Sequence, residues 1–211
     1  MDRAPTVARL TLATDPAFDA LVRIYKAALP ASERKGVEAL RAMLARPDYE
    51  FLLARRDDEV LGFAIVIRVA GGEACLLEYM AVDVAHRGGG IGSFLFRASV
   101  ASAGAQTLLL EVDAEDPAAP DAEERVRRRA FYRRLGCRQV AGLRYLMPAV
   151  TRERPPSMGL FVLREPLPAR IPKAELQSWL ECLYVSVYGR SPADPLIGEM
   201  LAPLPAEIPL I

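Results

Sequence analysis

The chain contains 211 residues, of which 52% are hydrophobic, and its 27 Lys and Arg residues balance its 27 Asp and Glu residues. This length suits one domain with a modest extension, and the zero formal charge excludes a general electrostatic attraction to nucleic acid or to an anionic membrane surface. No apolar run approaches the ~18 residues that a membrane span needs, and the first residues lack the apolar segment of a signal peptide. We therefore expect a soluble, cytoplasmic protein that binds neither nucleic acid nor membrane.

The N-terminal part has the pattern of one strand and two helices. Residues 7–12 alternate apolar and polar side chains, which indicates a strand. Asp15 and Pro16 then supply an N-cap and a first helical residue, and Pro30 ends the helix. A second helix is predicted over residues 37–45.

Three strands follow, at residues 50–56, 59–69 and 73–82, separated by turn signals at Asp57-Asp58 and Gly71-Gly72. Strands joined by such short turns predict an antiparallel meander. The later part of the pattern predicts a helix over 90–103, a strand over 107–113, a helix that Gly136 stops, and strands near 138–147 and 158–164.

The residues after 165 combine an amphipathic segment with a proline-rich tail. Apolar side chains recur at helical spacing over residues 173–188, which predicts a helix. Five prolines punctuate residues 192–211, for which we expect an extended chain. An apolar appendage of this kind suits a subunit interface in a homodimer, a lid over a substrate or a simple cover of the core, and the sequence leaves these three alternatives open.

The most informative segment is residues 77–92, where a strand-like run leads into three glycines, Gly92 and a helical pattern. A strand that stops at glycines and continues as a helix leaves unpaired backbone N–H groups at the positive end of the helix, which favours an anion such as phosphate. A nucleotide P-loop needs Lys-Ser/Thr after its last glycine, and here Ser93-Phe94 follow. A dinucleotide fingerprint needs glycine at position 93 or 95, where the chain has Ser93 and Leu95. An ordinary glycine turn stays open as the alternative.

The remaining pattern, Arg87-x-x-Gly90-x-Gly92, resembles the pyrophosphate loop of the GNAT superfamily of acyl-CoA-dependent N-acyltransferases. Residues 129–137, RAFYRRLGC, resemble the second GNAT signature. The resemblance implies an α+β protein with the GNAT acyltransferase fold, in which helices flank a central mixed, mostly antiparallel sheet. It implies a GNAT-like domain over residues 1–165 and a C-terminal helix and tail over 166–211 that pack on the domain or on a partner subunit.

The resemblance also implies a function and a set of site residues. It implies acetyl-CoA as co-substrate and transfer of the acetyl group to a primary amine of a small-molecule or amino-acid-like acceptor, by direct attack in a ternary complex. In this reading Tyr132 protonates the departing thiolate, with a core aromatic residue as the alternative. The main chain of three strand residues binds the pantetheine arm, and the loop binds the pyrophosphate; these residues are Met80, Ala81 and Val82, and Arg87, Gly88, Gly89, Gly90, Ile91, Gly92 and Ser93.

For the base, the sequence offers Glu78 and Glu111, which occupy apolar positions of two predicted strands. Either carboxylate could relay a proton through water, and a structural ion pair with an arginine is the alternative for both. We prefer Glu78. His86, the only histidine, is interpreted as an exposed loop residue. Tyr25 and Arg34, on the helical pair where GNAT relatives place part of the acceptor site, are the candidate substrate contacts, and burial in the core is the alternative for Tyr25.

The chain departs from the family at Arg125, where relatives commonly carry a pantetheine-binding asparagine. Residues 113–124 contain six carboxylates and no basic residue, so this acidic loop either attracts a cationic amine or caps the following helix. The three widely spaced cysteines support neither a disulfide framework nor a zinc site. Two other functions stay open: a CoA-binding regulatory or interaction module without turnover, and a transferase of a longer acyl group.

Overall fold

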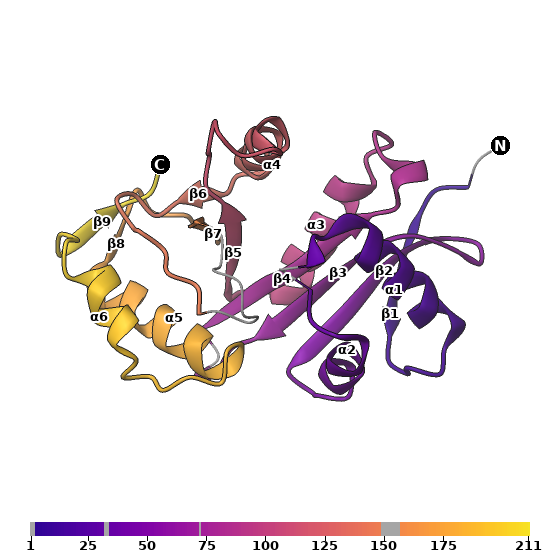
Figure 1. Ribbon diagram of the computed structural model, residues 1–211, viewed down its shortest axis with the longest axis horizontal. Helices are drawn as coiled ribbons and strands as arrows, with labels where there is room; N and C mark the ends of the chain where they lie inside the picture. Colours follow the sequence, from indigo (N-terminus) through magenta and orange to yellow (C-terminus); the bar gives the residue numbers. More distant parts are fainter. Residues whose placement is uncertain (1–2, 32–33, 72, 149–156) are drawn as a thin grey trace. The chain divides into compact units, whose positions relative to one another are not determined.

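The computed structural model describes residues 3–31, 34–71, 73–148 and 157–211 (Figure 1). These residues form two compact units. Unit 1 comprises Met1–Arg68 and Leu77–Gly104, and unit 2 comprises Val69–Leu76 and Ala105–Ile211. Seven strands form one mixed sheet in the order β1-β2-β3-β4-β5-β7-β6, and β4 contributes residues to both units. Helices accompany the strands throughout, which confirms the predicted α+β class.

Unit 1 contains the N-terminal strands and helices in the predicted order. β1 pairs antiparallel with β2, and β2 pairs antiparallel with β3. Its helices α1 and α3 both contact β3, and α2 contacts β2. The elements are β1 (Thr6–Leu10), α1 (Pro16–Ala28), α2 (Val37–Leu44), β2 (Tyr49–Arg56), β3 (Glu59–Arg68), the second half of β4 (Ala74–Val82), a short 3-10 helix (Val84–His86) and α3 (Ile91–Ala103).

Two local signals of the sequence act as predicted in unit 1. The Asp15 carboxylate accepts a hydrogen bond from the Ala17 N–H at 2.8 Å, and Pro16 is the first helical residue of α1. The turn between β2 and β3 contains Asp57 in the left-handed region, with φ of 51°. Gly72 of the other predicted turn lies outside the described residues.

The core of unit 1 is centred on β3, in which every residue between Glu59 and Arg68 is buried. Gly62 lies at the point of closest packing. A Cβ added there would lie 2.6 Å from the carbonyl oxygen of Ala81 and 3.0 Å from the Leu95 side chain. Only glycine therefore lets β4 and α3 pack this closely on β3, which fixes the end of β4 that leads into the glycine loop.

Unit 2 contains the remaining strands and helices. The first residues of β4 pair in parallel with β5 over three positions, which end at Leu76 and Leu109. β5 pairs antiparallel with β7, and β7 with β6. Figure 1 shows β8 beside β9 and α6 beside α5. The elements are β5 (Thr107–Asp113), α4 (Ala122–Arg134), β6 (Arg138–Gln139), β7 (Met158–Leu163), β8 (Arg170–Pro172), α5 (Lys173–Ser186), α6 (Pro195–Leu201) and β9 (Glu207–Pro209).

Two predicted elements of unit 2 were wrong. The strand expected over residues 138–147 is reduced to β6, because Gly142 adopts a left-handed conformation with φ of 71° and only single bridges at Val140 and Tyr145 follow. The tail expected to be extended forms α6 and β9. Asp194 caps α6 by accepting the Leu196 N–H at 3.1 Å, and Pro195 is its first residue.

The C-terminal residues 166–211 pack on the strands of unit 2. Trp179, Leu180 and Leu183 of α5 are buried. The Gln139 N–H donates to the Ile211 carbonyl at 2.7 Å, and the Ile211 N–H donates to the Gln139 carbonyl at 2.9 Å.

The three cysteines are free thiols: Cys75 and Cys137 are buried, and Cys182 of α5 is half-buried. Within the described part of the chain, no helix is long and apolar enough to cross a membrane.

Candidate active site

The glycine loop joins the end of β4 to α3. Asp83 starts the short 3-10 helix by accepting the Ala85 N–H at 3.1 Å, and the Arg23 guanidinium lies 2.7 Å from its other oxygen. Arg87 is extended and exposed. Gly88 and Gly90 then adopt left-handed conformations, with φ of 84° and 79°.

The start of α3 is open to an anion. Gly90 is its N-cap residue and offers no side chain to the N–H groups of the first turn. A Cβ added at Gly88 or Gly90 would meet no neighbouring atom of the described residues within 4 Å, and both residues are exposed. These glycines are therefore required by backbone conformation and not by protein packing, and they leave free space at the positive end of the helix.

The second half of β4 is more exposed than its first half. Glu78, Tyr79, Met80 and Val82 are half-buried, and Ala81 is buried. Residues 80–82 come after Leu76, the last β4 residue in the ladder with β5. Their main-chain groups are thus outside that ladder, and the pantetheine contact of these residues stays a prediction.

Glu78 is held by two partners from other elements of unit 1. The Lys35 ammonium lies 2.5 Å from one carboxylate oxygen, and the Tyr49 hydroxyl donates to the other at 2.8 Å. The Glu78 side chain is 5% exposed, so this ion pair is largely shielded from water. Burial and the Glu78 charge both raise the pKa of Tyr49, which keeps its phenol protonated as the donor.

Tyr25 and Arg34 belong to the same region of unit 1. Tyr25 is 1% exposed, and its hydroxyl accepts the Lys35 N–H at 2.8 Å. Its ring meets the Tyr79 ring edge to face, with centroids 5.1 Å apart. Arg34 donates to the Lys26 carbonyl at 2.8 Å. Tyr25 is therefore a core residue whose hydroxyl holds the segment before α2. Tyr25 contacts the main-chain N–H of Lys35, and Glu78 contacts its ammonium.

Tyr132 lies on α4 of unit 2 and is 8% exposed. Burial is the main cause that raises the pKa of its phenol, so the group remains protonated at neutral pH. The helix ends where the sequence predicted, because Gly136 adopts a left-handed conformation with φ of 92° and the Cys137 N–H returns to the Tyr132 carbonyl at 3.1 Å.

Glu111 lies on β5 and accepts hydrogen bonds from two tyrosines that the sequence did not indicate. The Tyr188 hydroxyl lies 2.7 Å from each carboxylate oxygen, and the Tyr145 hydroxyl also donates to one of them. Tyr188 stands 77 positions away in the sequence, so no local pattern signals the contact.

His86 is half-buried, and its Nε2 lies 3.5 Å from the Glu59 carboxylate.

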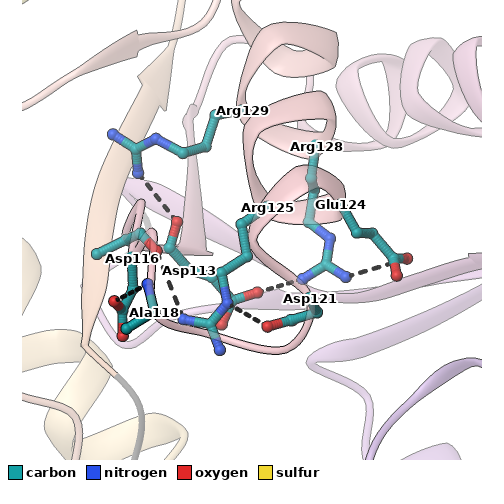
Figure 2. A network of polar contacts seen from close by, with 9 residues as sticks. Asp113, Asp116, Ala118, Asp121, Glu124, Arg125, Arg128 and Arg129 are labelled. Atoms are coloured by element: carbon teal, nitrogen blue, oxygen red, sulfur yellow. Dashed lines mark hydrogen bonds and ion pairs between the residues drawn. The ribbon is translucent and has the colours of Figure 1, made fainter.

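The acidic loop of residues 113–124 is paired with arginines of α4 (Figure 2). The Arg125 guanidinium lies 2.8 Å from the Asp121 carboxylate, and Arg128 forms ion pairs with both Asp113 and Glu124. Two further carboxylates of the loop, Glu115 and Glu123, form ion pairs with Arg129 and Arg127. Five of the six carboxylates of the loop are thus paired with arginines, which argues against the hypothesis that the loop attracts a cationic amine. Asp121, the N-cap residue of α4, makes no side-chain capping hydrogen bond.

Comparisons with known proteins place the glycine loop and Tyr132 within a recognised domain. Residues 47–138 match the family model of the acetyltransferase (GNAT) domain. A comparison with curated proteins finds no match.

Solved structures share the fold. An acetyltransferase of the GNAT family from Bacteroides thetaiotaomicron is 22% identical, with 87% of this chain and 98% of that chain covered and a TM-score of 0.71. An aminoglycoside 6'-N-acetyltransferase complexed with coenzyme A is 20% identical, with coverages of 77% and 99% and a TM-score of 0.57. The ribosomal-protein-S18-alanine N-acetyltransferase from Escherichia coli is 20% identical, with coverages of 74% and 91% and a TM-score of 0.51. The predicted fold class is confirmed.

Proposed function

We propose that this chain moves an acetyl group from acetyl-CoA to a primary amine of a small-molecule or amino-acid-like acceptor, because its residues 47–138 match the acetyltransferase (GNAT) domain and acetyltransferases share its fold. The observation that carries the proposal is the open start of α3. Gly88 and Gly90 leave a space there that no side chain of the described residues fills, next to the exposed Arg87. Such a helix start binds a phosphate group through backbone N–H groups.

Acetyl-CoA fits the residues around this loop. The N–H groups of residues 88–93 and the Arg87 guanidinium would hold the pyrophosphate, and the main chain of residues 80–82 would bind the pantetheine arm. The aminoglycoside 6'-N-acetyltransferase of the same fold was solved with coenzyme A, which supports this choice of co-substrate. An acetyl group is our proposal for the acyl chain.

The proposed reaction is direct transfer in a ternary complex. The acceptor nitrogen attacks the thioester carbonyl, a C–N bond forms, the C–S bond breaks, and the amine loses one proton. A carboxylate receives that proton. Tyr132 donates a proton to the thiolate; burial raises the pKa of its phenol, so the phenol carries its proton at neutral pH.

An amine acceptor is supported by two structural neighbours whose names specify aminoglycoside 6'-N-acetylation and ribosomal-protein-S18-alanine N-acetylation. In both names the acetylated atom is a nitrogen. We propose a small molecule or an amino-acid-like compound for this chain, and the binding module without turnover and the transferase of a longer acyl group are the outcomes that would replace it.

Calorimetric titration with acetyl-CoA tests the cofactor first, with Gly90→Ala as the variant and Gly104→Ala as its matched control. Both glycines have positive φ, stand at opposite ends of α3, and leave open space for a Cβ. Gly90 lies in the left-handed region (φ 79°, ψ 0°), where alanine costs about 1 kcal/mol, whereas Gly104 (φ 63°, ψ −123°) lies outside it, so Gly104→Ala carries the larger strain and is the stricter control. We expect micromolar binding by the natural protein, at least tenfold weaker binding by Gly90→Ala, and unchanged binding by Gly104→Ala.

A panel of primary amines, with release of the CoA thiol as the readout, then tests turnover. Absence of acetyl-CoA binding by the natural protein would remove the proposed co-substrate. Binding without thiol release on any amine would favour the CoA-binding module. Faster release from octanoyl-CoA than from acetyl-CoA would favour a longer acyl group.

A further inference from the structure

The C-terminal extension contains a groove between α5 and α6. The groove has a volume of about 680 Å³, and every residue that lines it belongs to unit 2. The buried side chains of Ile197 and Leu201 form its apolar floor, and the exposed Gly198 and Ala202 also line it. A Cβ added at Gly198 would meet no neighbouring atom of the described residues within 4 Å. The small residues of α6 therefore leave room for another helix to approach closely.

One row of side chains on α5 forms the opposite wall of the groove. Lys173, Gln177 and Glu181 are spaced four residues apart, so they lie on one face of the helix. The row runs from a positive charge, through a neutral amide, to a negative charge. Because its two ends are about 12 Å apart along the helix axis, Lys173 and Glu181 of one chain are not neighbours on the helix surface.

Neither end of this row forms an ion pair within the described part of the chain. The Gln177 amide donates to the Glu181 carboxylate at 2.7 Å, which leaves the negative charge unbalanced. The third ionised side chain that lines the groove, Asp194, is already paired with Arg190 at 2.9 Å. Lys173 is the first residue of α5, where the helix dipole disfavours a cation. The charge of Lys173 thus does not stabilise its own helix, and a partner outside the chain accounts for it.

The row is complementary to a second copy of itself. In a two-fold symmetric contact, a residue that faces a given position of the partner is itself faced by the same pair in reverse. If two α5 helices lie antiparallel and cross at Gln177, Lys173 of each copy faces the partner's Glu181. The two Gln177 side chains then face each other, and each amide offers both a donor and an acceptor. One symmetric contact therefore balances four charges.

We propose that this groove is the docking surface for a second copy of the chain, in an antiparallel homodimer centred on Gln177. The partner's α5 lies along the groove, against the small residues of α6. Apolar contact supplies affinity, and the two Lys173–Glu181 pairs fix the register. A parallel arrangement is excluded because it would place like charges side by side. The dimer goes beyond the proposed function, and its test needs neither acetyl-CoA nor an acceptor.

Sedimentation velocity of the full chain, from micromolar to submillimolar concentrations, tests the dimer. We expect the natural protein to dimerise and Lys173→Glu to weaken the dimer at least tenfold, because two carboxylates then face each other at both ends of the contact. Glu181→Lys should weaken it similarly, by opposing two ammonium groups. Lys26→Glu, at an exposed lysine of α1, changes the net charge as Lys173→Glu does and should leave the dimer unchanged.

A mixture of the two single variants separates charge pairing from any folding defect. Lys173→Glu makes both ends of the row negative, and Glu181→Lys makes both ends positive. An equimolar mixture should therefore form a heterodimer of about the natural strength. The double variant Lys173→Glu/Glu181→Lys reverses both ends and should recover the homodimer. Recovery in either experiment requires folded chains.

Disulfide formation tests the register. Gln177→Cys in a Cys182→Ser background, which removes the half-buried thiol of α5, should give a covalent dimer on oxidation with copper phenanthroline. Val185→Cys in the same background is the matched control, because Val185 continues the row and is 40% exposed. In this register the two residues 185 lie about 24 Å apart along the helix axes, whereas a disulfide needs Cα atoms within about 7 Å. The control should remain monomeric under denaturing conditions.

Each outcome decides the proposal. A natural protein that stays monomeric at the highest concentration would overturn it and leave the groove to another occupant, such as a peptide. A dimer that the charge reversals do not weaken, or one that is cross-linked through Val185→Cys and not through Gln177→Cys, would also overturn it. Acetyl-CoA binding and thiol release are measured separately, so failure of the dimer and failure of the proposed function are distinguishable.

Discussion

The ammonium of Lys35 lies 2.5 Å from the carboxylate of Glu78, and only 20% of the lysine side chain and 5% of the glutamate side chain are exposed. Lys35 comes from the segment before α2, and Glu78 comes from β4. The pair therefore joins two elements of unit 1 that are distant in sequence, with the Tyr49 hydroxyl as a further donor to the carboxylate.

Lys35→Met should lower the free energy of unfolding by about 3 kcal/mol, because it leaves a buried carboxylate without its cation. The double variant Lys35→Met/Glu78→Gln should recover a large part of that loss, since no uncompensated charge remains. Urea denaturation of the natural protein, both single variants and the double variant measures the coupling. Additive losses would contradict the view that the pair is structural.

Tyr132→Phe should lower kcat about 100-fold and change the dissociation constant of acetyl-CoA less than twofold, since the substitution removes a proton donor and keeps the ring. Steady-state kinetics and calorimetry make the two measurements. Phe131→Leu, at the neighbouring ring of α4, serves as a control for altered packing. Unchanged kcat in Tyr132→Phe would eliminate the phenol as the acid.

Neutralising three carboxylates of the acidic loop, in Asp121→Asn/Glu123→Gln/Glu124→Gln, should leave the KM of a cationic acceptor within twofold of the natural value. The reason is that Arg125, Arg127 and Arg128 already balance these charges. The exposed pairs on α4 should contribute little to stability, because water and salt screen them. A fivefold rise in KM would restore a direct role for the loop in acceptor binding.

Asp83 makes the free energy of unfolding depend on pH. The Ala85 N–H and then the Arg23 guanidinium hold the pKa of Asp83 below its usual range. Because the folded-state pKa is the lower one, the carboxylate stabilises the fold above its unfolded pKa, about 3.9, and this stabilisation is lost as the pH falls through the folded-state pKa.

The stability difference between the natural protein and Asp83→Asn should therefore be largest near pH 6 and should shrink by pH 3. Urea midpoints at pH 6, 4.5 and 3 measure it. Asp58→Asn, at a fully exposed side chain, is the control and should differ little from the natural protein at every pH. A constant difference across the three pH values would contradict the assigned cause.

Signals that act within a few residues were predictable from the sequence. Asp15-Pro16 starts α1, Gly136 stops α4, and the glycines before α3 take the left-handed conformations that the loop needs. Each depends on backbone geometry at one place. The strands over residues 49–82 were found because their apolar runs are long and bounded by turns.

Contacts between distant residues were not predictable. Lys35 and Glu78 are 43 positions apart, and Tyr188 and Glu111 are 77 positions apart, so only the folded chain brings them together. Helix α6 was missed for another reason. Asp194-Pro195 carries the same start signal as Asp15-Pro16, but the surrounding prolines outweighed it in the pattern.

The unequal burial of the three cysteines makes the natural protein suitable for single-site labelling. Cys75 and Cys137 are buried, and burial raises the pKa of Cys137 to about 12, so neither thiol reacts readily with an alkylating dye. Cys182 is half-buried and sits on α5, the helix that leads to Tyr188. A fluorophore attached there, without any engineered cysteine, would report in real time whether the C-terminal extension changes its environment when an acceptor arrives.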